Sequence, residues 1–273
     1  MDRKKVQFPD RLDIMVIVIW IVIAIIAAFN DLQISEHFVN YNSFLGQFTA
    51  NYGTIPGYFL ILVSLILLPH NIAREKWVNE GFDKDNIMAM AIVLLWLVPS
   101  FIIAYQLTES FILRIVLTLV IPIPPVVIYR RYEDQISPHV IKAAKQVLLV
   151  AVIVPAGIVG ITKTLWGRVR YRDLNASHSN FTPWYLPQGI TGNFSFPSGH
   201  SAMAWLTLAS IFYFRNPKKR LTVIIITAIW ALTVCIGRVV IGAHYLSDVT
   251  FSAAIAILVI NYFVKKNRIE ESA

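Results

Sequence analysis

The sequence predicts an all-α integral membrane protein with about eight transmembrane helices. Three observations support this fold class. The 273-residue chain is 56% hydrophobic and 15% charged, whereas soluble domains are about 45–50% apolar and about 25% charged. Its mean hydropathy is +0.61. Finally, its apolar residues form long runs that only a lipid bilayer would solvate.

Eight apolar runs are expected to form the transmembrane helices. They are Ile14–Phe29, Ile55–Pro69, Ile87–Tyr105, Phe111–Tyr129, Val147–Ile161, Ser198–Phe214, Leu221–Ile236 and Tyr245–Val264. The first run lacks a good cleavage site for a signal peptidase, so we expect a retained helix. The second run begins with Pro56, which a first helical turn tolerates. The fourth contains Pro122, Pro124 and Pro125, which should kink its helix.

Lysine and arginine are distributed unevenly between the polar segments. With the N-terminus in the cytoplasm, the cytoplasmic segments are 1–13, 70–86, 130–145, 215–220 and the tail, and all are rich in Lys and Arg. The segments 30–54 and 106–110 then form outer loops without Lys or Arg. The positive-inside rule therefore predicts cytoplasmic N- and C-termini, in a protein of the plasma membrane. Scattered charges of this kind argue against a nucleic-acid partner, despite the net charge of +8.

The loops 162–197 and 237–244 break the positive-inside rule. They place five cations on the outer side, namely Lys163, Arg168, Arg170, Arg172 and Arg238. This exception indicates that some of these cations are anion ligands. Each one alone is also explained as an anchor at the membrane interface, and we expect that role for Arg168 and Arg172. His178 and Asp173 are interpreted as ordinary loop residues.

Two histidines lie at expected membrane edges. His244 and Asp248 are four residues apart, so on a helix they share one face, where the carboxylate could orient the imidazole for nucleophilic attack. A simple pairing at a helix start explains the same spacing. His200 follows Pro197-Ser198-Gly199, where a helix start offers free N–H groups to an anion and the histidine could protonate a leaving oxygen. An N-capping serine beside an incidental histidine is the alternative.

Taken together, these pieces resemble the membrane members of the type 2 phosphatidic acid phosphatase superfamily, which is related to vanadium haloperoxidases. That family has a lysine, six residues and Arg-Pro; then Pro-Ser-Gly-His; then Ser-Arg, five residues, His, three residues and Asp. This chain has, in the same order, Lys163, Arg170-Tyr171, Pro197-Ser198-Gly199-His200, Gly237-Arg238, His244 and Asp248. The resemblance covers roughly residues 140–264. It implies a phosphatase/haloperoxidase-like helical core in the C-terminal half, residues 139–266, preceded by N-terminal transmembrane helices in 1–138, within one membrane domain.

The resemblance also implies roles for individual residues. His244 would attack phosphorus to form a phosphohistidine, Asp248 would orient it, and His200 would protonate the leaving group. The phosphate oxygens would be held by Lys163, Arg170, Arg238 and the backbone donors of Ser198 and Gly199. No metal or cofactor is implied. The chain departs from the family pattern at Tyr171, where the family has proline, and at Gly237, where it has serine.

The expected function is that of a metal-independent phosphatase acting on a lipid phosphate or diphosphate at the outer leaflet. An undecaprenyl diphosphate-like carrier lipid fits the predicted topology best, followed by phosphatidic acid or phosphatidylglycerol phosphate. The partners are then the lipid substrate and the bilayer. A phosphatase of a soluble sugar phosphate, as in the glucose-6-phosphatase branch, and a non-catalytic phospholipid binder or transporter are alternatives. The aromatic segment 181–186 either lies on the membrane or packs over helix ends.

Overall fold

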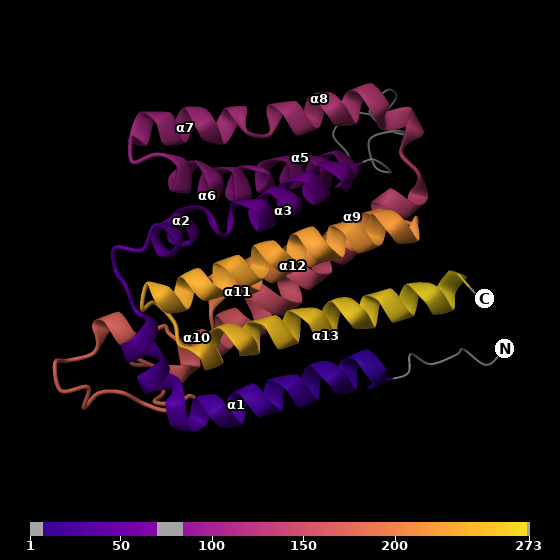
Figure 1. Cartoon of the computed structure of the whole chain (residues 1–273). Coiled ribbons are helices and arrows are strands. Elements are labelled where there is room, and N and C mark those ends of the chain that lie inside the picture. The colour runs from indigo at the N-terminus through magenta and orange to yellow at the C-terminus, as the bar shows by residue number, and fades with distance from the viewer. Residues whose placement is uncertain (1–7, 70–83, 272–273) are drawn as a thin grey trace.

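The computed structural model describes residues 8–69 and 84–271, and these residues form helices and no strand (Figure 1). The α-helices of the N-terminal half are α1 (Arg11–Phe38), α2 (Phe44–Tyr52), α3 (Ile55–Leu67), α5 (Lys84–Leu95), α6 (Leu97–Leu107), α7 (Phe111–Val120) and α8 (Ile123–Tyr132). Those of the C-terminal half are α9 (Pro138–Ala151), α10 (Gly160–Trp166), α11 (Gly199–Leu206), α12 (Pro217–Val240) and α13 (Leu246–Glu271). The shorter or irregular helices are η1 (Glu133–Gln135), η2 (Val152–Val159), η3 (Tyr171–Asp173) and η4 (Thr207–Tyr213).

Within the described residues, seven helical segments are long and apolar enough to cross a membrane. The protein is therefore an integral membrane protein. The eighth expected span, Ser198–Phe214, forms α11 and η4, which together are shorter than a full span. The predicted cytoplasmic segment 70–86 lies almost entirely outside the described residues, as does the start of segment 1–13.

Two polar segments differ from the sequence prediction in being largely helical. The expected outer loop 30–54 instead contains the last two turns of α1 and all of α2. α1 continues beyond its apolar run because its polar end packs inside the protein, where Asp31 and Ser35 are buried. α9 likewise starts at Pro138, inside the expected connector 130–145. At the end of α1, the buried polar side chains mark contact with protein rather than irregular structure.

The predicted kink in the fourth span is confirmed. α7 ends at Val120, and α8 starts at Ile123 after a break at Ile121–Pro122. Proline cannot donate the intrahelical hydrogen bond, and its ring clashes with the preceding turn. The two prolines that follow lie at the start of α8, where the missing N–H groups would be unpaired in any helix.

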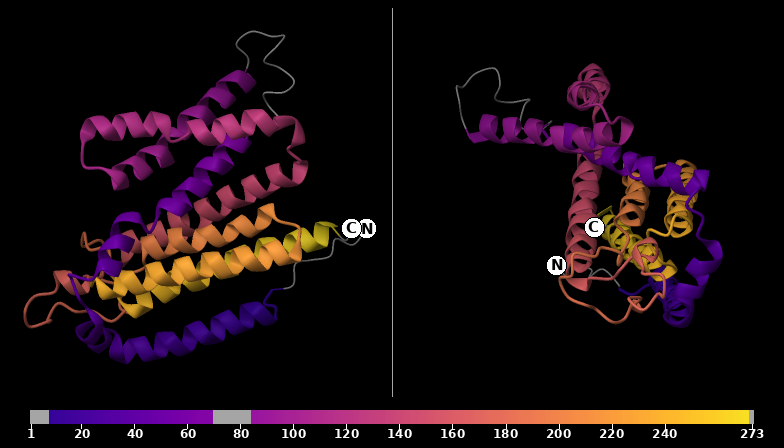
Figure 2. Two further views of the ribbon diagram at one scale, coloured as in Figure 1. Left: turned by 45° about the horizontal axis from the view of Figure 1, so that its top comes forward. Right: turned by 90° about the vertical axis from the view of Figure 1, so that its left-hand side faces the viewer.

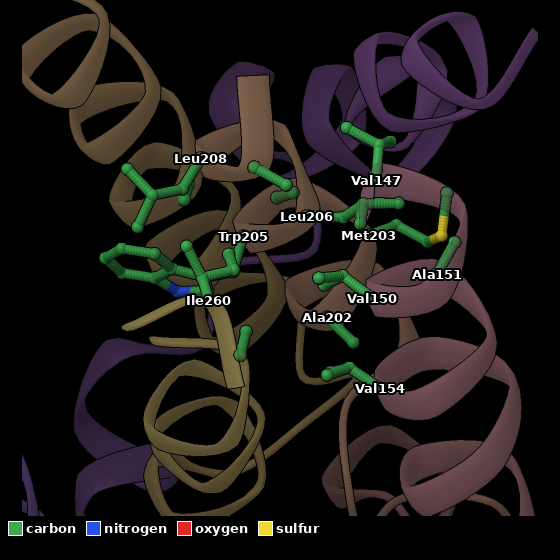
Figure 3. Close-up of a cluster of buried hydrophobic side chains, with 14 of the residues drawn as sticks. Val147, Val150, Ala151, Val154, Ala202, Met203, Trp205, Leu206, Leu208 and Ile260 are labelled. Atoms are coloured by element: carbon green, nitrogen blue, oxygen red, sulfur yellow. The ribbon is translucent and has the colours of Figure 1, made fainter. Parts of the chain in front are cut away.

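α11 is the centre of the C-terminal half. Every residue from Ser201 to Leu206 is buried, and Figure 3 shows α11 side chains packed against Val147, Val150 and Val154 from α9 and η2 and against Ile260 from α13. Small residues such as Ala202 allow close approach between helices, which drives association where lipid supplies no hydrophobic force. Enclosure on all sides explains why α11 can be short, since it does not need to match the bilayer itself.

The helices α1, α2 and α3 pack onto this C-terminal half, whereas α5 to α8 form an outer layer. α1 runs along α13, and α2 packs against the end of α12. α3 contacts α9 on one side and α6 on the other, and α7 covers α6. Both views of Figure 2 accordingly place α7 and α8 on the side of the bundle remote from α1.

α1 is attached to α13 near the end of the bundle that carries the chain termini. Asp10 and Asp13 form a capping box at the start of α1. The buried carboxylate of Asp13 accepts hydrogen bonds from Lys265 and, at 2.8 Å, from Asn261. A second buried carboxylate on α1, that of Asp31, joins the two helices near their other ends, as described below.

Candidate active site

The three predicted motifs meet at the end of the bundle opposite the chain termini (Figure 1). Lys163 lies on α10, His200 in the first turn of α11, and Arg238 in the last turn of α12. Asp248 lies in the first turn of α13, and His244 lies in the short connection that precedes that helix. The fold therefore gathers segments that are distant in the sequence into one site.

His244 lies before α13 and not on it, contrary to the helical pairing expected from its spacing. α13 begins at Leu246, and the chain leaves α12 through a turn in which Gly242 has a φ of 66°. Glycine adopts this left-handed conformation without a steric penalty. The His244 N–H donates to the Arg238 carbonyl oxygen at 3.2 Å. The imidazole is 2% exposed, and its Nδ1 lies 3.4 Å from Asp248 Oδ2.

The Asp248 carboxylate is fixed by groups from three segments. Its Oδ1 accepts from Arg168 Nη1 at 2.6 Å. Its Oδ2 accepts from Ser195 Oγ at 2.5 Å and from the Tyr245 N–H at 3.0 Å. The distance to His244 Nδ1 exceeds that of a normal hydrogen bond. The carboxylate is thus held rigidly in front of the imidazole and can fix the orientation of that ring.

Arg168 is not an interfacial anchor, which corrects the sequence interpretation. Its side chain is completely buried and bridges Asp248 to Asp31 of α1, with Nη2 donating to Asp31 Oδ2 at 2.9 Å. Nη1 also donates to Ser247 Oγ at 2.8 Å, and the guanidinium lies 4.0 Å from the centre of the Tyr245 ring. A buried charge needs such compensation because it has lost its hydration. Arg172 does lie at the surface, 3.7 Å from Asp173.

The Pro-Ser-Gly-His motif caps α11 and connects it to α13. Ser198 is the N-cap, with its hydroxyl accepting from the Ser201 N–H. The Ser198 N–H donates to the Asp248 backbone carbonyl at 3.0 Å. This N–H is therefore already used, so of the two predicted backbone donors only Gly199 can serve a phosphate. The space beside Gly199 is open, since a Cβ there would meet no atom within 4 Å.

The His200 ring is positioned by the N-terminal half. Its Nε2 lies 3.2 Å from the Ala50 carbonyl oxygen of α2. Because a carbonyl oxygen only accepts, Nε2 carries a proton, and Nδ1 of the neutral ring is the unprotonated nitrogen. A second proton, on Nδ1, would give the acid needed for a leaving group.

Three cations surround the two histidines. Lys163 Nζ donates to the Pro197 carbonyl oxygen at 3.1 Å, which places it at the Pro-Ser-Gly-His loop. Lys163, Arg170 and Arg238 all lie close enough to His200 to lower its pKa. The Nε atoms of Arg170 and Arg238 are buried and have no hydrogen-bond partner among the described residues. Buried donors are normally satisfied, so these two guanidinium groups indicate a site for an anion.

Both imidazoles are neutral in this environment. Burial lowers the pKa of His244 well below its ordinary value, and the nearby charges of Lys163 and Arg238 lower it further. Burial lowers the pKa of His200 to about 3, with Arg238 as the next largest cause. Desolvation and neighbouring cations both disfavour the charged imidazolium. A bound phosphate would offset the cations and favour a proton on His200.

The aromatic segment 181–186 packs against the middle of α1 and the end of α10. Trp184 Nε1 donates to the Ala24 carbonyl oxygen of α1 at 3.0 Å, and its ring packs edge-on against Trp20. Trp166 Nε1 donates to the Trp184 carbonyl oxygen at 2.7 Å. Of the two roles considered for this segment, the structure supports packing over α1 and α10.

Comparison with protein families gives one match, to the PAP2 superfamily over residues 145–269. The matched range contains all three motifs and both histidines. This half of the chain belongs to the PAP2 superfamily. Members of the superfamily are phosphatases, which supports phosphatase activity for this chain, and its long apolar helices support an integral membrane protein. Neither the curated proteins nor the solved structures include a match.

The residue at 237 departs from the PAP2 motif for a steric reason. A Cβ on Gly237 would lie 2.0 Å from Thr49 Oγ1 of α2, so no side chain fits while α2 is in place. The threonine hydroxyl occupies the space that a serine at 237 would need. Tyr171, the other departure, faces the Gly242 turn: a Cβ added at Gly242 would lie 3.3 Å from its ring.

Sequence reasoning missed four residues that shape the site, namely Asp31, Thr49, Arg168 and Ser195. The signal for Arg168 was present, because it lies in the loop that breaks the positive-inside rule, between Lys163 and Arg170. The signal for Asp31 was weaker: an acid immediately after an apolar run, in a segment without lysine or arginine. Thr49 and Ser195 have no pattern that distinguishes them from other small polar residues.

Proposed function

We propose that this membrane phosphatase hydrolyses a lipid phosphate or diphosphate without a metal ion, through a phosphohistidine intermediate. The observation that carries the proposal is the pair of buried Nε atoms on Arg170 and Arg238, which have no partner within residues 8–69 and 84–271 and lie beside two neutral imidazoles. Guanidinium groups bind phosphate oxygens in a planar, bidentate manner. Fixed cations around a transferring phosphoryl group supply most of the stabilisation of its transition state.

In the first step, His244 Nε2 attacks phosphorus. Asp248, facing Nδ1, keeps the proton on that nitrogen and leaves the lone pair on Nε2. As the P–N bond forms, the P–O bond to the lipid breaks. The electron pair leaves with that oxygen, which takes the proton from His200. Lys163, Arg170 and Arg238 hold the phosphoryl oxygens throughout, with the Gly199 N–H.

In the second step, water attacks the phosphohistidine. His200, now neutral, accepts the proton of that water as a general base. The P–N bond breaks, its electron pair returns to His244 Nε2, and inorganic phosphate leaves. The site is then restored for another cycle, so the same imidazole serves first as acid and then as base.

A lipid substrate is favoured by the position of the site. The motif residues lie where α10 and α12 end and α13 begins, and the ends of membrane-spanning helices are expected to lie near the lipid headgroups. The positive-inside rule predicts that this end lies outside the cytoplasm, with both termini cytoplasmic, and we propose the plasma membrane as the location. A carrier lipid diphosphate of the undecaprenyl type in the outer leaflet fits this topology best, before phosphatidic acid or phosphatidylglycerol phosphate.

The decisive experiment measures phosphate release from purified lipid phosphates in detergent with a chelator present. We expect His244→Ala to abolish release while the variant still inserts into membranes. His178→Ala is the matched control, because His178 lies in the neighbouring loop, paired with Glu36 at 3.0 Å. Full activity of His244→Ala would refute the covalent mechanism, and a requirement for added divalent metal would refute the metal-independent one.

Two further measurements separate the alternatives. A sugar phosphate tested beside the lipid panel distinguishes the soluble-substrate alternative, which predicts turnover without micelles. Vanadate, which mimics five-coordinate phosphorus, should inhibit a phosphatase with submillimolar or tighter affinity, since transition-state analogues bind at least about 10²-fold more tightly than substrates. A non-catalytic binder would release no phosphate and would show no such preference for vanadate over phosphate.

The orientation of the site is tested by cysteine labelling in intact cells. Ala176→Cys places a thiol in the exposed loop near the site, and Lys218→Cys places one in the exposed turn at the other end. The native Cys235 is buried, so its background reaction is low. A membrane-impermeant maleimide should label the first variant and not the second. The reverse pattern would place the active site in the cytoplasm.

A further inference from the structure

We infer that Asp31, on α1 and outside the PAP2-matched residues, is a positioning residue for the Asp248–His244 pair. The inference rests on the proposed function, in which His244 is the nucleophile. Asp31 does not approach the phosphate-binding cations directly. It acts through Arg168 and Ser247, the two side chains that connect it to Asp248.

The contacts of Asp31 are those of a fully satisfied buried carboxylate. It is 1% exposed. Its Oδ1 accepts from the Ser247 N–H at 3.2 Å, and its Oδ2 accepts from Ser247 Oγ and from Arg168 Nη2 at 2.9 Å. Both partners also touch Asp248, since Arg168 Nη1 donates to it at 2.6 Å and Ser247 precedes it in the first turn of α13. One carboxylate therefore fixes two neighbours of the other.

The charges explain why this connection affects the nucleophile. Arg168 is shared between two carboxylates, and all three side chains lie within the protein interior. Electrostatic interactions are strong there because the effective dielectric constant is low. Without the charge of Asp31, Arg168 would keep Asp248 as its one carboxylate partner among the described residues, beside its hydrogen bonds to Ser247 and the Thr182 carbonyl. Asp248 would then be drawn toward the guanidinium and away from His244 Nδ1, which already lies 3.4 Å away.

Asp13 provides a matched comparison within the same helix. It is also a buried carboxylate of α1, and it also pairs with α13, through Lys265 and Asn261. It lies in the first turn of α1, and Figure 1 shows this end of α1 at the end of the bundle that carries the chain termini. If α1 merely had to be attached to α13, loss of either carboxylate would have the same effect on turnover.

The experiment compares Asp31→Asn with Asp13→Asn in the full-length protein. The amide keeps the shape and one acceptor but removes the charge. We expect Asp31→Asn to lower kcat by about 10–100-fold, as loss of an outer residue that orients a reacting group typically does, with KM changed less than about threefold. The rate of phosphoenzyme formation from labelled substrate should fall in parallel. Asp13→Asn should retain the wild-type kcat.

The outcomes are distinct. Wild-type kcat in Asp31→Asn, an equal loss in Asp13→Asn, or a rise in KM alone would overturn the inference. If Asp31→Asn does not insert, Ser247→Ala decides: lowered kcat at constant KM supports the inference, and an unchanged kcat overturns it. Retained activity in His244→Ala would instead refute the proposed function, whereas an inactive His244→Ala beside a fully active Asp31→Asn refutes only the role of Asp31.

Discussion

The contact between Gly237 of α12 and Thr49 of α2 allows a quantitative prediction. A Cβ at position 237 would lie 2.0 Å from Thr49 Oγ1 and 3.0 Å from both its Cβ and its Cγ2. Thr49 is completely buried, and its hydroxyl donates to the Leu45 carbonyl oxygen at 2.9 Å. The threonine therefore cannot turn aside without losing that bond, so Gly237→Ala must separate α2 from α12.

The expected size follows from opposing effects. Alanine normally stabilises a helix interior by about 1 kcal/mol relative to glycine. Overpacking a filled site costs about 1–3 kcal/mol, and breaking the threonine hydrogen bond costs about 1 kcal/mol more. We therefore expect Gly237→Ala to destabilise the protein by about 1–3 kcal/mol. For a domain of this size that corresponds to a thermal midpoint lower by about 3–10 °C.

The assay is thermal unfolding in detergent for a double-mutant cycle. Thr49→Ala removes the atom at 2.0 Å, so the double variant Gly237→Ala, Thr49→Ala should be more stable than the two separate losses predict, by about 1 kcal/mol or more. Gly199→Ala is the control for stability, since a Cβ there meets nothing within 4 Å. A Gly237→Ala variant as stable as the wild type, or additive losses in the cycle, would refute the steric explanation.

Two further predictions concern the charges of the site. Arg168→Met should leave two buried carboxylates without a cation, and breaking a buried ion pair destabilises proteins by about 3–5 kcal/mol. Thermal unfolding should show a large fall in the midpoint, together with loss of turnover. An unchanged midpoint would contradict the role of Arg168 in bridging Asp31 and Asp248. The second prediction is that kcat/KM is higher at acidic pH. Because the pKa of free His200 is near 3, its proton must arrive with the substrate monoanion. The second pKa of the substrate phosphate is about 6. Thus kcat/KM should fall as pH rises through about 6. Because the pKa of His244 is also low, protonation of this nucleophile should lower kcat/KM only at pH values well below 6.5. A rate that rises between pH 6 and pH 8 would contradict this assignment.

The sequence predicts the membrane helices well because a bilayer demands long apolar runs whatever their neighbours are. It fails where protein replaces lipid. α1 extends beyond its apolar run because Asp31 and Ser35 pack against protein, and hydropathy cannot detect that environment. α11 is shorter than a full span for the same reason, since its surroundings are other helices.

For the candidate site, motif spacing predicts which residues come together but not how they are held. His244 and Asp248 do lie side by side, but a glycine turn brings them together where helical periodicity was expected. Arg168 was interpreted as an interfacial anchor because a single sequence cannot show that its partners come from α1 and α13. The free N–H expected of Ser198 is likewise taken by a carbonyl from another helix.

α1 and α2 pack onto the C-terminal half and contribute residues to its site, which limits where this chain can be cut and joined to a relative. α1 supplies Asp31, which binds the same arginine as Asp248. α2 supplies the Ala50 carbonyl to His200 and the threonine that leaves no room for a side chain at position 237. A chimera that joins the N-terminal helices of one relative to the C-terminal half of another would combine site residues that do not fit each other. Natural sequence change at Thr49 and Gly237 should accordingly occur in concert.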